Sequence, residues 1–298
     1  MKVFRINLKS ALIIFLLLVS FVPLIFVIIS RNNHENTLET DKLKDVTNKK
    51  TIEFEGKQRV IDFYNYLKEH EKKYMSQNGE DGVIISLIKL FKLDEQKTKT
   101  FVEIGANMGV ECNTKYIKDF FNWKGVQFDA SMHFSDRALY QEVITHDNVL
   151  SVLDKYNVTI EFDILSEDTD YADYWIIEKL LTKYRPKLII HEVNQQTPDR
   201  CVTVEKPTIP IFWRHDVHHE YTGGSVCAFY CLAKSYKYTM IYCESAGVNC
   251  FWARNDIVEK YLKVNSSNIQ QLLDPYFLFK KPNFDYGPTL KKWHVVGC

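Results

Sequence analysis

The run Thr100-Phe-Val-Glu-Ile-Gly-Ala-Asn-Met-Gly109 decides the fold class of this chain. Residues 100–104 have the apolar, β-forming composition of a buried strand, and the strand ends at Gly105. Gly105 and Gly109 lie between this strand and a following helix, where they permit a tight turn and close approach of a ligand to the backbone. The G-x-G-x-x-G spacing of dinucleotide-binding turns is absent. The run therefore predicts a ligand-binding turn of another kind.

A second strand, Gly125–Asp129, ends on an acidic residue 20 positions after Gly109. A carboxylate at this place accepts hydrogen bonds from both hydroxyls of a ribose. The order of strand, glycine turn, helix, strand and terminal aspartate is typical of a site for an adenosine-type cofactor. The predicted cofactor-binding residues are Glu103, Gly105, Asn107, Gly109 and Asp129.

Further strands and helices alternate along the rest of the chain. Residues 159–165 and 187–193 are predicted strands, with a helix over 174–184 between them. Residues 238–243 and 249–254 flank a glycine-containing turn and predict an antiparallel hairpin. The pattern indicates an α/β fold with a doubly wound, mostly parallel sheet that ends in this hairpin. The stretch between Asp129 and Thr159 is predicted to be too short for a full third strand-helix unit.

Acidic and amide side chains follow two successive predicted strands. Glu167, Asp168 and Asp170 come after the third strand, and Glu192 and Asn194 end the next one. Ligands of doubly wound sheets bind beyond the carboxyl ends of the strands, so these side chains are expected at one mouth of the sheet. Asp168, Glu192 and Asn194 offer the hard oxygen ligands that suit Mg²⁺. Asp168 and Glu192 are also the predicted catalytic residues, orienting a hydroxyl and taking its proton.

The N-terminal part has the features of a membrane anchor. Residues 11–29 carry no charge and, as a helix, span about 28 Å, close to the thickness of the hydrocarbon core. No small-residue cleavage site follows, which favours a retained signal-anchor over a cleaved signal peptide. Lys2, Arg5 and Lys9 precede the run, so the positive-inside rule places the N-terminus in the cytosol. The predicted division is a cytoplasmic tail over 1–10, the anchor over 11–29, a stalk with an amphipathic helix over 30–73, and a domain over 74–298 in the ER or Golgi lumen or outside the cell.

Cysteines and glycosylation motifs fit this topology. Cys243 and Cys250 bracket a short turn and are positioned to pair across two strands in an oxidising compartment. Cys227 and Cys231 are expected to be buried free thiols in a helix over 226–233 that Ser225 caps. Two sequons, at Asn157 and Asn265, predict a glycoprotein. Lysines plus arginines number 38, as do aspartates plus glutamates, so no basic excess points to a nucleic-acid partner.

Seven short motifs, taken in order, resemble the FkbM-type methyltransferase-like family, which has the class I S-adenosylmethionine-dependent methyltransferase fold. The motifs are Ser76 to Gly82, Phe101 to Gly105, Trp123 to Val126, Leu165 to Asp170, Asp173 to Trp175, Ile190 to Asn194, and Gly247 to Phe251. The resemblance covers roughly residues 74 to 254. It implies a seven-stranded fold and methyl transfer from S-adenosylmethionine to an oxygen nucleophile. Tyr171 departs from the family pattern, since members usually have glycine after the acidic pair.

The sequence thus predicts a membrane-anchored O-methyltransferase that acts on a small-molecule, glycan or lipid acceptor of the secretory pathway. Two alternatives stay open. The type II anchor together with Asp168-x-Asp170 is typical of a metal-dependent glycosyltransferase that uses a nucleotide sugar. Tyr171 and the short middle stretch are consistent with a non-catalytic binding domain on the same fold.

Overall fold

A computed structural model describes residues 55–109, 112–131, 138–197, 200–210, 221–281 and 292–298. The chain divides into two compact units, Met1–Glu55 and Gly56–Cys298. The predicted tail, membrane span and most of the stalk lie outside the described residues. Within the described ranges, no helix is both long enough and apolar enough to cross a membrane.

A seven-stranded sheet forms the centre of the unit Gly56–Cys298, with the strand order β3-β2-β1-β4-β5-β8-β7. Strands β1 to β5 run parallel, and β8 is antiparallel to both of its neighbours. The strands are β1 (Thr100–Ile104), β2 (Lys124–Asp129), β3 (Leu139–Gln141), β4 (Ile164–Glu167), β5 (Leu188–Glu192), β7 (Tyr238–Cys243) and β8 (Asn249–Arg254). The predicted doubly wound α/β fold with a C-terminal antiparallel pair is confirmed.

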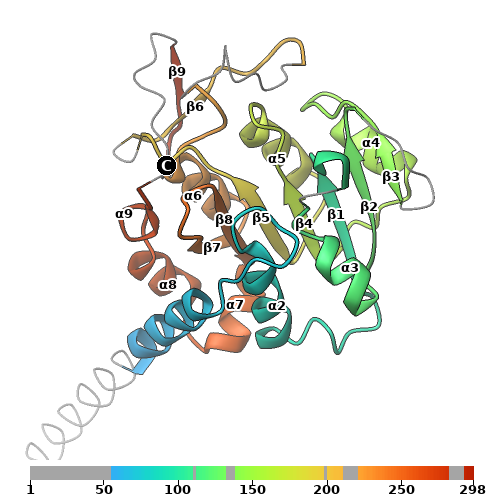
Figure 1. Cartoon of the computed structure of the whole chain (residues 1–298). Helices are drawn as coiled ribbons and strands as arrows, with labels where there is room; N and C mark the ends of the chain where they lie inside the picture. Colours follow the sequence, from blue (N-terminus) through green and yellow to red (C-terminus); the bar gives the residue numbers. More distant parts are fainter. Residues whose placement is uncertain (1–54, 110–111, 132–137, 198–199, 211–220, 282–291) are drawn as a thin grey trace, which may run out of the picture. The chain divides into compact units, whose positions relative to one another are not determined.

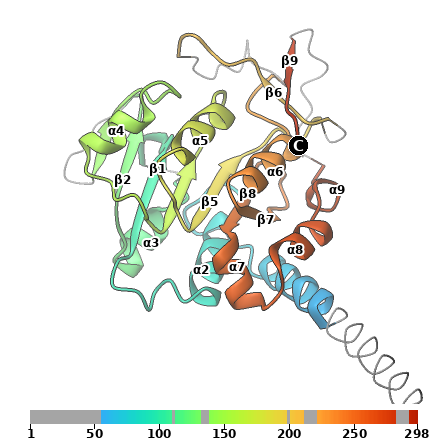
Figure 2. The same cartoon turned by 180° about the vertical axis from the view of Figure 1, so that it is seen from behind.

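Helices cover both faces of this sheet (Figures 1 and 2). Right-handed crossovers place α3 on one face and α4, α5 and α6 on the other. The reason is that the chain first runs from β1 through β2 to β3 at one edge of the sheet, and then returns to β4 and continues towards the other edge. The helices are α2 (Glu80–Leu90), α3 (Lys115–Phe121), α4 (Val149–Lys155), α5 (Asp173–Leu181), α6 (Val226–Ser235), α7 (Asn255–Leu262), α8 (Ser266–Leu272) and α9 (Pro275–Leu278), with a 3₁₀ turn at Asn107–Gly109. The chain changes direction between β1 and β4, which is where ligands of such sheets bind.

The middle of the chain differs from the prediction. A third strand-helix unit is present, since β3 and α4 both fit between Asp129 and Thr159. The unit is short because β3 is an edge strand that pairs with β2 over only three residues. The strand predicted from Thr159 begins instead at Ile164. Residue Asp163 is buried just before it and accepts hydrogen bonds from the backbone N–H of Thr100 and from the Lys187 ammonium group, which fixes a turn there.

The predicted amphipathic helix occupies residues 55–69 of the described chain. Val60, Phe63, Tyr64 and Leu67 are buried in the same hydrophobic core as the sheet, whereas Ile61 is 43% exposed. The compact unit therefore starts earlier than the predicted domain boundary at residue 74. The helix belongs to the core because its apolar face follows the 3.6-residue period, which Ile61 does not share.

A small second sheet lies beyond the carboxyl end of the main sheet (Figure 1). Strands β6 (Val202–Val204) and β9 (Trp293–Val295) pair antiparallel in it. Three disulfides are present in the described chain, namely Cys201–Cys227, Cys231–Cys298 and Cys243–Cys250. The predicted pairing of Cys243 with Cys250 is confirmed. The expectation of free thiols at Cys227 and Cys231 is wrong, because distant segments bring a partner to each of them.

Candidate functional site

A cavity of about 570 Å³ opens at the carboxyl ends of β1, β2 and β4. Gly105, Asp129 and Asp168, each directly after or at the end of one of these strands, form its floor. Residues 142–148, between β3 and α4, form one wall, and residues 207–210, after β6, form another. The cavity lies within the usual size range of small-molecule and cofactor sites. It also lies at the topological switch point, where the fold is expected to bind a ligand.

Gly105 allows two strand ends to meet under the cavity. Its φ is +79°, a conformation that favours glycine, and its N–H donates to the Phe128 carbonyl at 2.9 Å. A Cβ built on Gly105 would lie 1.5 Å from the carbonyl oxygen of Asp168. The backbone N–H of Asp168 in turn donates to the Ile104 carbonyl at 3.0 Å. A side chain at position 105 would therefore clash with the protein's own backbone, so glycine is needed here for packing as well as for lining the cavity.

Asp129, the residue predicted to bind a ribose, ends β2 and lines the cavity. Its Oδ1 accepts hydrogen bonds from the backbone N–H of Ser131, at 2.8 Å, and from the Ser131 hydroxyl. This turn fixes the orientation of the carboxylate in the lining of the cavity.

The other predicted cofactor residues have different places. The Glu103 side chain is buried away from the cavity, where its carboxylate accepts hydrogen bonds from the Thr114 hydroxyl at 2.5 Å and the Gln127 amide at 2.7 Å. It links β1 to α3 and β2. Asn107 and Gly109 form the 3₁₀ turn, and neither lines the cavity. The reason is that the chain leaves the cavity floor immediately after Gly105 and turns towards α3.

Three carboxylates come together at the ends of β4 and β5. Oxygen atoms of Asp168, Asp170 and Glu192 all lie within 4.8 Å of one another. Burial and the charges of Asp170 and Asp173 hold the pKa of Asp168 well above its ordinary value. Burial and the charge of Asp168 do the same to the pKa of Glu192, and burial together with Asp173 raises the pKa of Asp170 to about 7. None of these three carboxylates forms an ion pair with a lysine or arginine of the described chain.

Two further carboxylates are buried behind this group. Glu167 and Asp173 are fully buried, and one oxygen of each has no hydrogen-bond partner among the described residues. Their other oxygens are held by Thr169, whose hydroxyl donates to Glu167 at 3.0 Å and whose N–H donates to Asp173 at 2.8 Å. Burial first, and then the charge of Asp173, raises the pKa of Glu167 well above its ordinary value. The segment after β4 therefore concentrates negative charge that protons or a cation must balance.

Asn194, the third predicted metal ligand, is tied into a turn. Its Oδ1 accepts from the N–H of Gln196 at 2.9 Å, and its Nδ2 donates to the Thr222 carbonyl at 3.2 Å. Asp170 takes its place in the cluster of three carboxylates, although sequence position alone did not separate Asp170 from its acidic neighbours. The backbone of Asp170 has a φ of +63°, and from this turn its carboxylate lies within 4.8 Å of those of Asp168 and Glu192.

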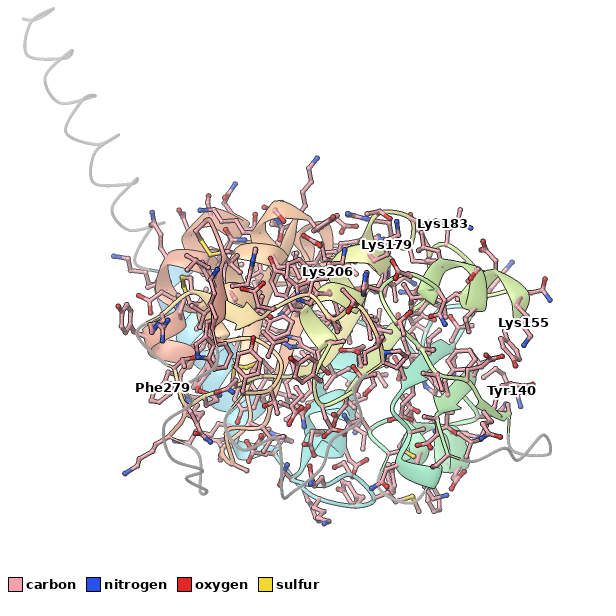
Figure 3. The ribbon with its side chains drawn as sticks, turned by 90° about the horizontal axis from the view of Figure 1, so that it is seen from above. Tyr140, Lys155, Lys179, Lys183, Lys206 and Phe279 are labelled. Atoms are coloured by element: carbon pink, nitrogen blue, oxygen red, sulfur yellow. A yellow bond between two sulfur atoms is a disulfide. The ribbon has the colours of Figure 1, made fainter. Side chains whose placement is uncertain are left out.

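The lining of the cavity is acidic overall. Its carboxylates are Asp129, Glu142, Asp147, Asp168 and Asp170, and no lysine or arginine is among the described residues that line it. Lys155, labelled in Figure 3, forms an ion pair with Glu142 at 2.5 Å and offsets that charge. Such a cavity favours a neutral or cationic ligand over an anionic one.

Tyr171 does not narrow the cavity. Its ring packs into a small separate core with Val202, Val204, Tyr221 and Trp293, while its neighbours Asp170 and Ala172 line the cavity. The tyrosine at this position therefore packs against the second sheet.

His146 and Asp147 line the cavity and were not predicted as site residues. The Nε2 atom of His146 lies 3.1 Å from an Asp147 oxygen, and burial lowers the pKa of this histidine, which favours its neutral form. The only signal in the sequence was that they follow a strand, and this strand was not recognised.

Comparisons with known proteins give matches in solved structures only. No family model and no curated protein matches this chain. The N-terminal domain of EvdMO1, crystallised in the presence of SAH and D-fucose, is similar with 9% identity and a TM-score of 0.37, over 66% of this chain and 94% of that one. The METTL16 MTase domain has 9% identity and a TM-score of 0.34, over 58% and 66%. An O-methyltransferase family protein from Burkholderia thailandensis has 7% identity and a TM-score of 0.33, over 59% and 57%. Likeness at this level assigns no function, which has to be argued from the residues of this chain.

Proposed function

We propose that this protein is a membrane-anchored S-adenosylmethionine-dependent O-methyltransferase that acts on a glycan or lipid acceptor of the secretory pathway. The observation that carries the proposal is the cavity at the switch point of the sheet, bounded by Gly105 and Asp129 and lined by acidic side chains. S-adenosylmethionine bears a net positive charge, because its sulfonium and ammonium groups outnumber its carboxylate. The lining therefore matches the charge of this cofactor.

The residues present fit the cofactor in two respects. The Gly105 turn exposes backbone at the floor of the cavity, and Asp129 places a carboxylate there at the end of β2, where ribose hydroxyls are bound in folds of this kind. When bound, S-adenosylmethionine supplies a methyl group on a positively charged sulfur that is open to attack by an oxygen nucleophile. The remaining work, which is to position the acceptor hydroxyl and remove its proton, falls to side chains of this chain.

Asp168, Asp170 and Glu192 are the candidates for that work. A general base is most effective when its pKa is close to the working pH, and the pKa of Asp170 is raised to about 7. The three carboxylates also fit a divalent cation, since oxygen ligands of one Mg²⁺ ion lie about 3–4 Å apart and these oxygens are already within 4.8 Å. A cation held by them would orient the acceptor hydroxyl and lower the pKa of that hydroxyl.

A second candidate function is a metal-dependent glycosyltransferase. The observation that favours it is that Asp168 and Asp170 share one cluster with Glu192. The absence of lysine and arginine from the described lining weighs against it, because the diphosphate of a nucleotide sugar would meet several carboxylates and no lysine or arginine side chain there.

One calorimetric experiment separates these functions. The full-length protein in detergent is titrated with S-adenosylmethionine, S-adenosylhomocysteine and UDP-sugars, each with Mg²⁺ and with chelator. The proposal expects binding of the two adenosyl compounds at micromolar concentration and no UDP-sugar binding. The opposite preference would establish the second candidate. Cofactor binding without methyl transfer to any acceptor in a glycan and lipid screen would identify a non-catalytic binding domain.

The membrane anchor and the lumenal location are part of this proposal. Three disulfides support an oxidising compartment, since such bonds are rare in the cytosol. Asn157 is exposed after α4, and Asn265 is exposed at the N-cap of α8. In a eukaryotic host at least one of them should carry a glycan that N-glycosidase removes, and the double variant N157Q/N265Q should lack this shift. Unchanged mobility, together with protease attack from the cytosolic side, would reject this orientation.

A further inference from the structure

One wall of the cavity belongs to a lobe outside the main sheet. Residues 207–210 line the cavity and follow β6 after only two residues, Glu205 and Lys206. The wall has little support of its own, since Ile209 is 69% exposed. The place of the wall is therefore set by the place of β6.

A disulfide fixes β6 to the main domain. Cys201 directly precedes β6, and its partner Cys227 lies in the first turn of α6, which packs on the sheet through Phe229. The partner strand β9 is fixed in the same way, because Cys298 is bonded to Cys231, one turn further along α6. The sulfur atoms of Cys201, Cys227 and Cys231 all lie within 4.8 Å of one another. Both bonds thus join the lobe to one face of one helix.

Hydrogen bonds continue from the disulfide towards the wall. The N–H of Val202 donates to the Ser225 hydroxyl at 3.1 Å, and the indole N–H of Trp175 donates to the Val204 carbonyl at 3.1 Å. Lys206, labelled in Figure 3, places its ammonium group 5.5 Å from the centre of the Trp175 ring. These contacts orient β6. Among the described residues, no backbone hydrogen bond joins the wall over 207–210 to the main sheet.

The same lobe also contacts the acidic segment of the site. Tyr171 packs with Val204 and Trp293 from the two strands of the lobe, and it directly follows Asp170. Movement of β6 would therefore shift the wall and the carboxylate cluster together.

We propose that the Cys201–Cys227 disulfide is a positioning element of the cavity, so that ligand binding requires this pair to be oxidised. With both sulfurs as thiols, β6 keeps its hydrogen bonds, its pairing with β9 and its packing against Tyr171. It loses its own covalent link to α6, and the wall over residues 207–210 moves away from the floor at Gly105. The site then binds its ligand in an oxidising compartment and is weakened in a reducing one. The inference rests on the proposed function, because that function is the reason for choosing S-adenosylhomocysteine as the probe.

The test compares two disulfide removals in the full-length protein. C201S/C227S removes the bond next to the wall. C243S/C250S is the matched control, since it removes a disulfide between β7 and β8 whose residues do not line the cavity. Hydrogen exchange of residues 202–209 is measured without ligand, and affinity for S-adenosylhomocysteine is measured by calorimetry. Both variants are expected to lose thermal stability because each lacks one disulfide, so thermal stability does not distinguish them.

C201S/C227S should exchange at least tenfold faster over residues 202–209 and bind the probe at least tenfold more weakly. C243S/C250S should keep the parent's exchange over these residues and its affinity within twofold. Parent-like affinity in C201S/C227S, or unchanged exchange, would overturn the proposal. A parent that binds no S-adenosylhomocysteine would reject the proposed function, while the exchange measurement would still decide whether the disulfide positions the wall.

Should C201S/C227S fail to fold, P207G/P210G loosens the wall with all disulfides intact, and its affinity should fall likewise. Parent-like affinity in that variant would also overturn the proposal.

Discussion

The carbonyl oxygen of Asp168 occupies the space that a side chain on Gly105 would need, 1.5 Å from the position of its Cβ. The ends of β1 and β4 therefore meet through backbone atoms, and both residues line the cavity. This contact joins the glycine turn that we propose to bind the cofactor to the carboxylate segment that we propose to bind the acceptor. The two parts of the proposed site thus meet at one backbone contact.

Replacing Gly105 by alanine should destabilise the fold itself. The new Cβ must displace the backbone of β4 and adopt a positive φ, at a cost of roughly 3 kcal/mol or more. Gly109→Ala is the matched control. Its φ is also positive, at +75°, but its Cβ would lie 3.5 Å from a flexible Leu139 methyl group, so it should cost only about 1–2 kcal/mol. Chemical denaturation measures both, and equal losses would show that the Asp168 contact is unimportant.

Asp129→Asn should weaken binding of S-adenosylhomocysteine by an order of magnitude or more. The amide can still accept the N–H of Ser131 and keep the turn, but it loses charge-assisted hydrogen bonds to the ribose, each about 1.5–3 kcal/mol. Ser131→Ala removes the hydroxyl from the same turn and leaves the carboxylate, so its affinity should stay close to that of the parent. A calorimetric titration in which D129N binds as the parent does would remove Asp129 from the site.

Changing Asp168 or Glu192 to its amide should weaken metal binding and turnover and leave cofactor binding nearly unchanged. Affinity for S-adenosylhomocysteine should change little, because the ribose contact at Asp129 is kept. Binding of Mn²⁺, used as a spectroscopic substitute for Mg²⁺, should fall at least tenfold, since one of three clustered carboxylates is lost. Turnover with any acceptor found by screening should fall roughly 10²-fold. Parent levels of Mn²⁺ binding and of methyl transfer in both variants would exclude these residues from the mechanism.

Stability should decrease as the pH rises from about 4 to about 7 when no metal is present. The pKa of Asp170 is raised from 3.8 to about 7 in the folded chain. Between these values the unfolded chain releases the proton and the folded chain keeps it, so the free energy of unfolding falls through this window. Mg²⁺ can replace the proton, and its stabilising effect should grow across the same range.

Thermal unfolding at several pH values, with chelator and with Mg²⁺, measures this dependence. Asp170→Asn should flatten the fall in chelator, because the amide does not titrate. If the variant and the parent show the same slope, Asp170 does not titrate as the structure indicates.

Tyr171→Gly should lower stability without improving ligand binding. The ring is buried among Val202, Val204, Tyr221 and Trp293, and removing a large buried aromatic side chain typically costs about 3–5 kcal/mol. Tyr171→Phe keeps the packing and should be nearly neutral. A gain in affinity for S-adenosylhomocysteine in Tyr171→Gly would instead show that this tyrosine narrows the site.

The sequence by itself determined the elements that depend on local pattern. Apolar runs that end in Gly105 or Asp129 identify β1 and β2, and the turn between residues 243 and 249 identifies the hairpin of β7 and β8. These signals lie within a few residues of one another, so no distant contact is needed to read them. The doubly wound class follows from their order along the chain.

Tertiary structure decided what the strand ends bring together. The central strand β1 is covered by helices on both faces, so nearly all its residues are buried, and the sequence does not reveal which face Glu103 takes. Asp170 joins Asp168 and Glu192 because the ends of β4 and β5, which are distant in sequence, lie side by side in the sheet. The pairing of Cys201 with Cys227, and the wall that it positions, depends on segments separated by 26 residues. Such contacts are selected by packing of the whole chain, which local spacing does not encode.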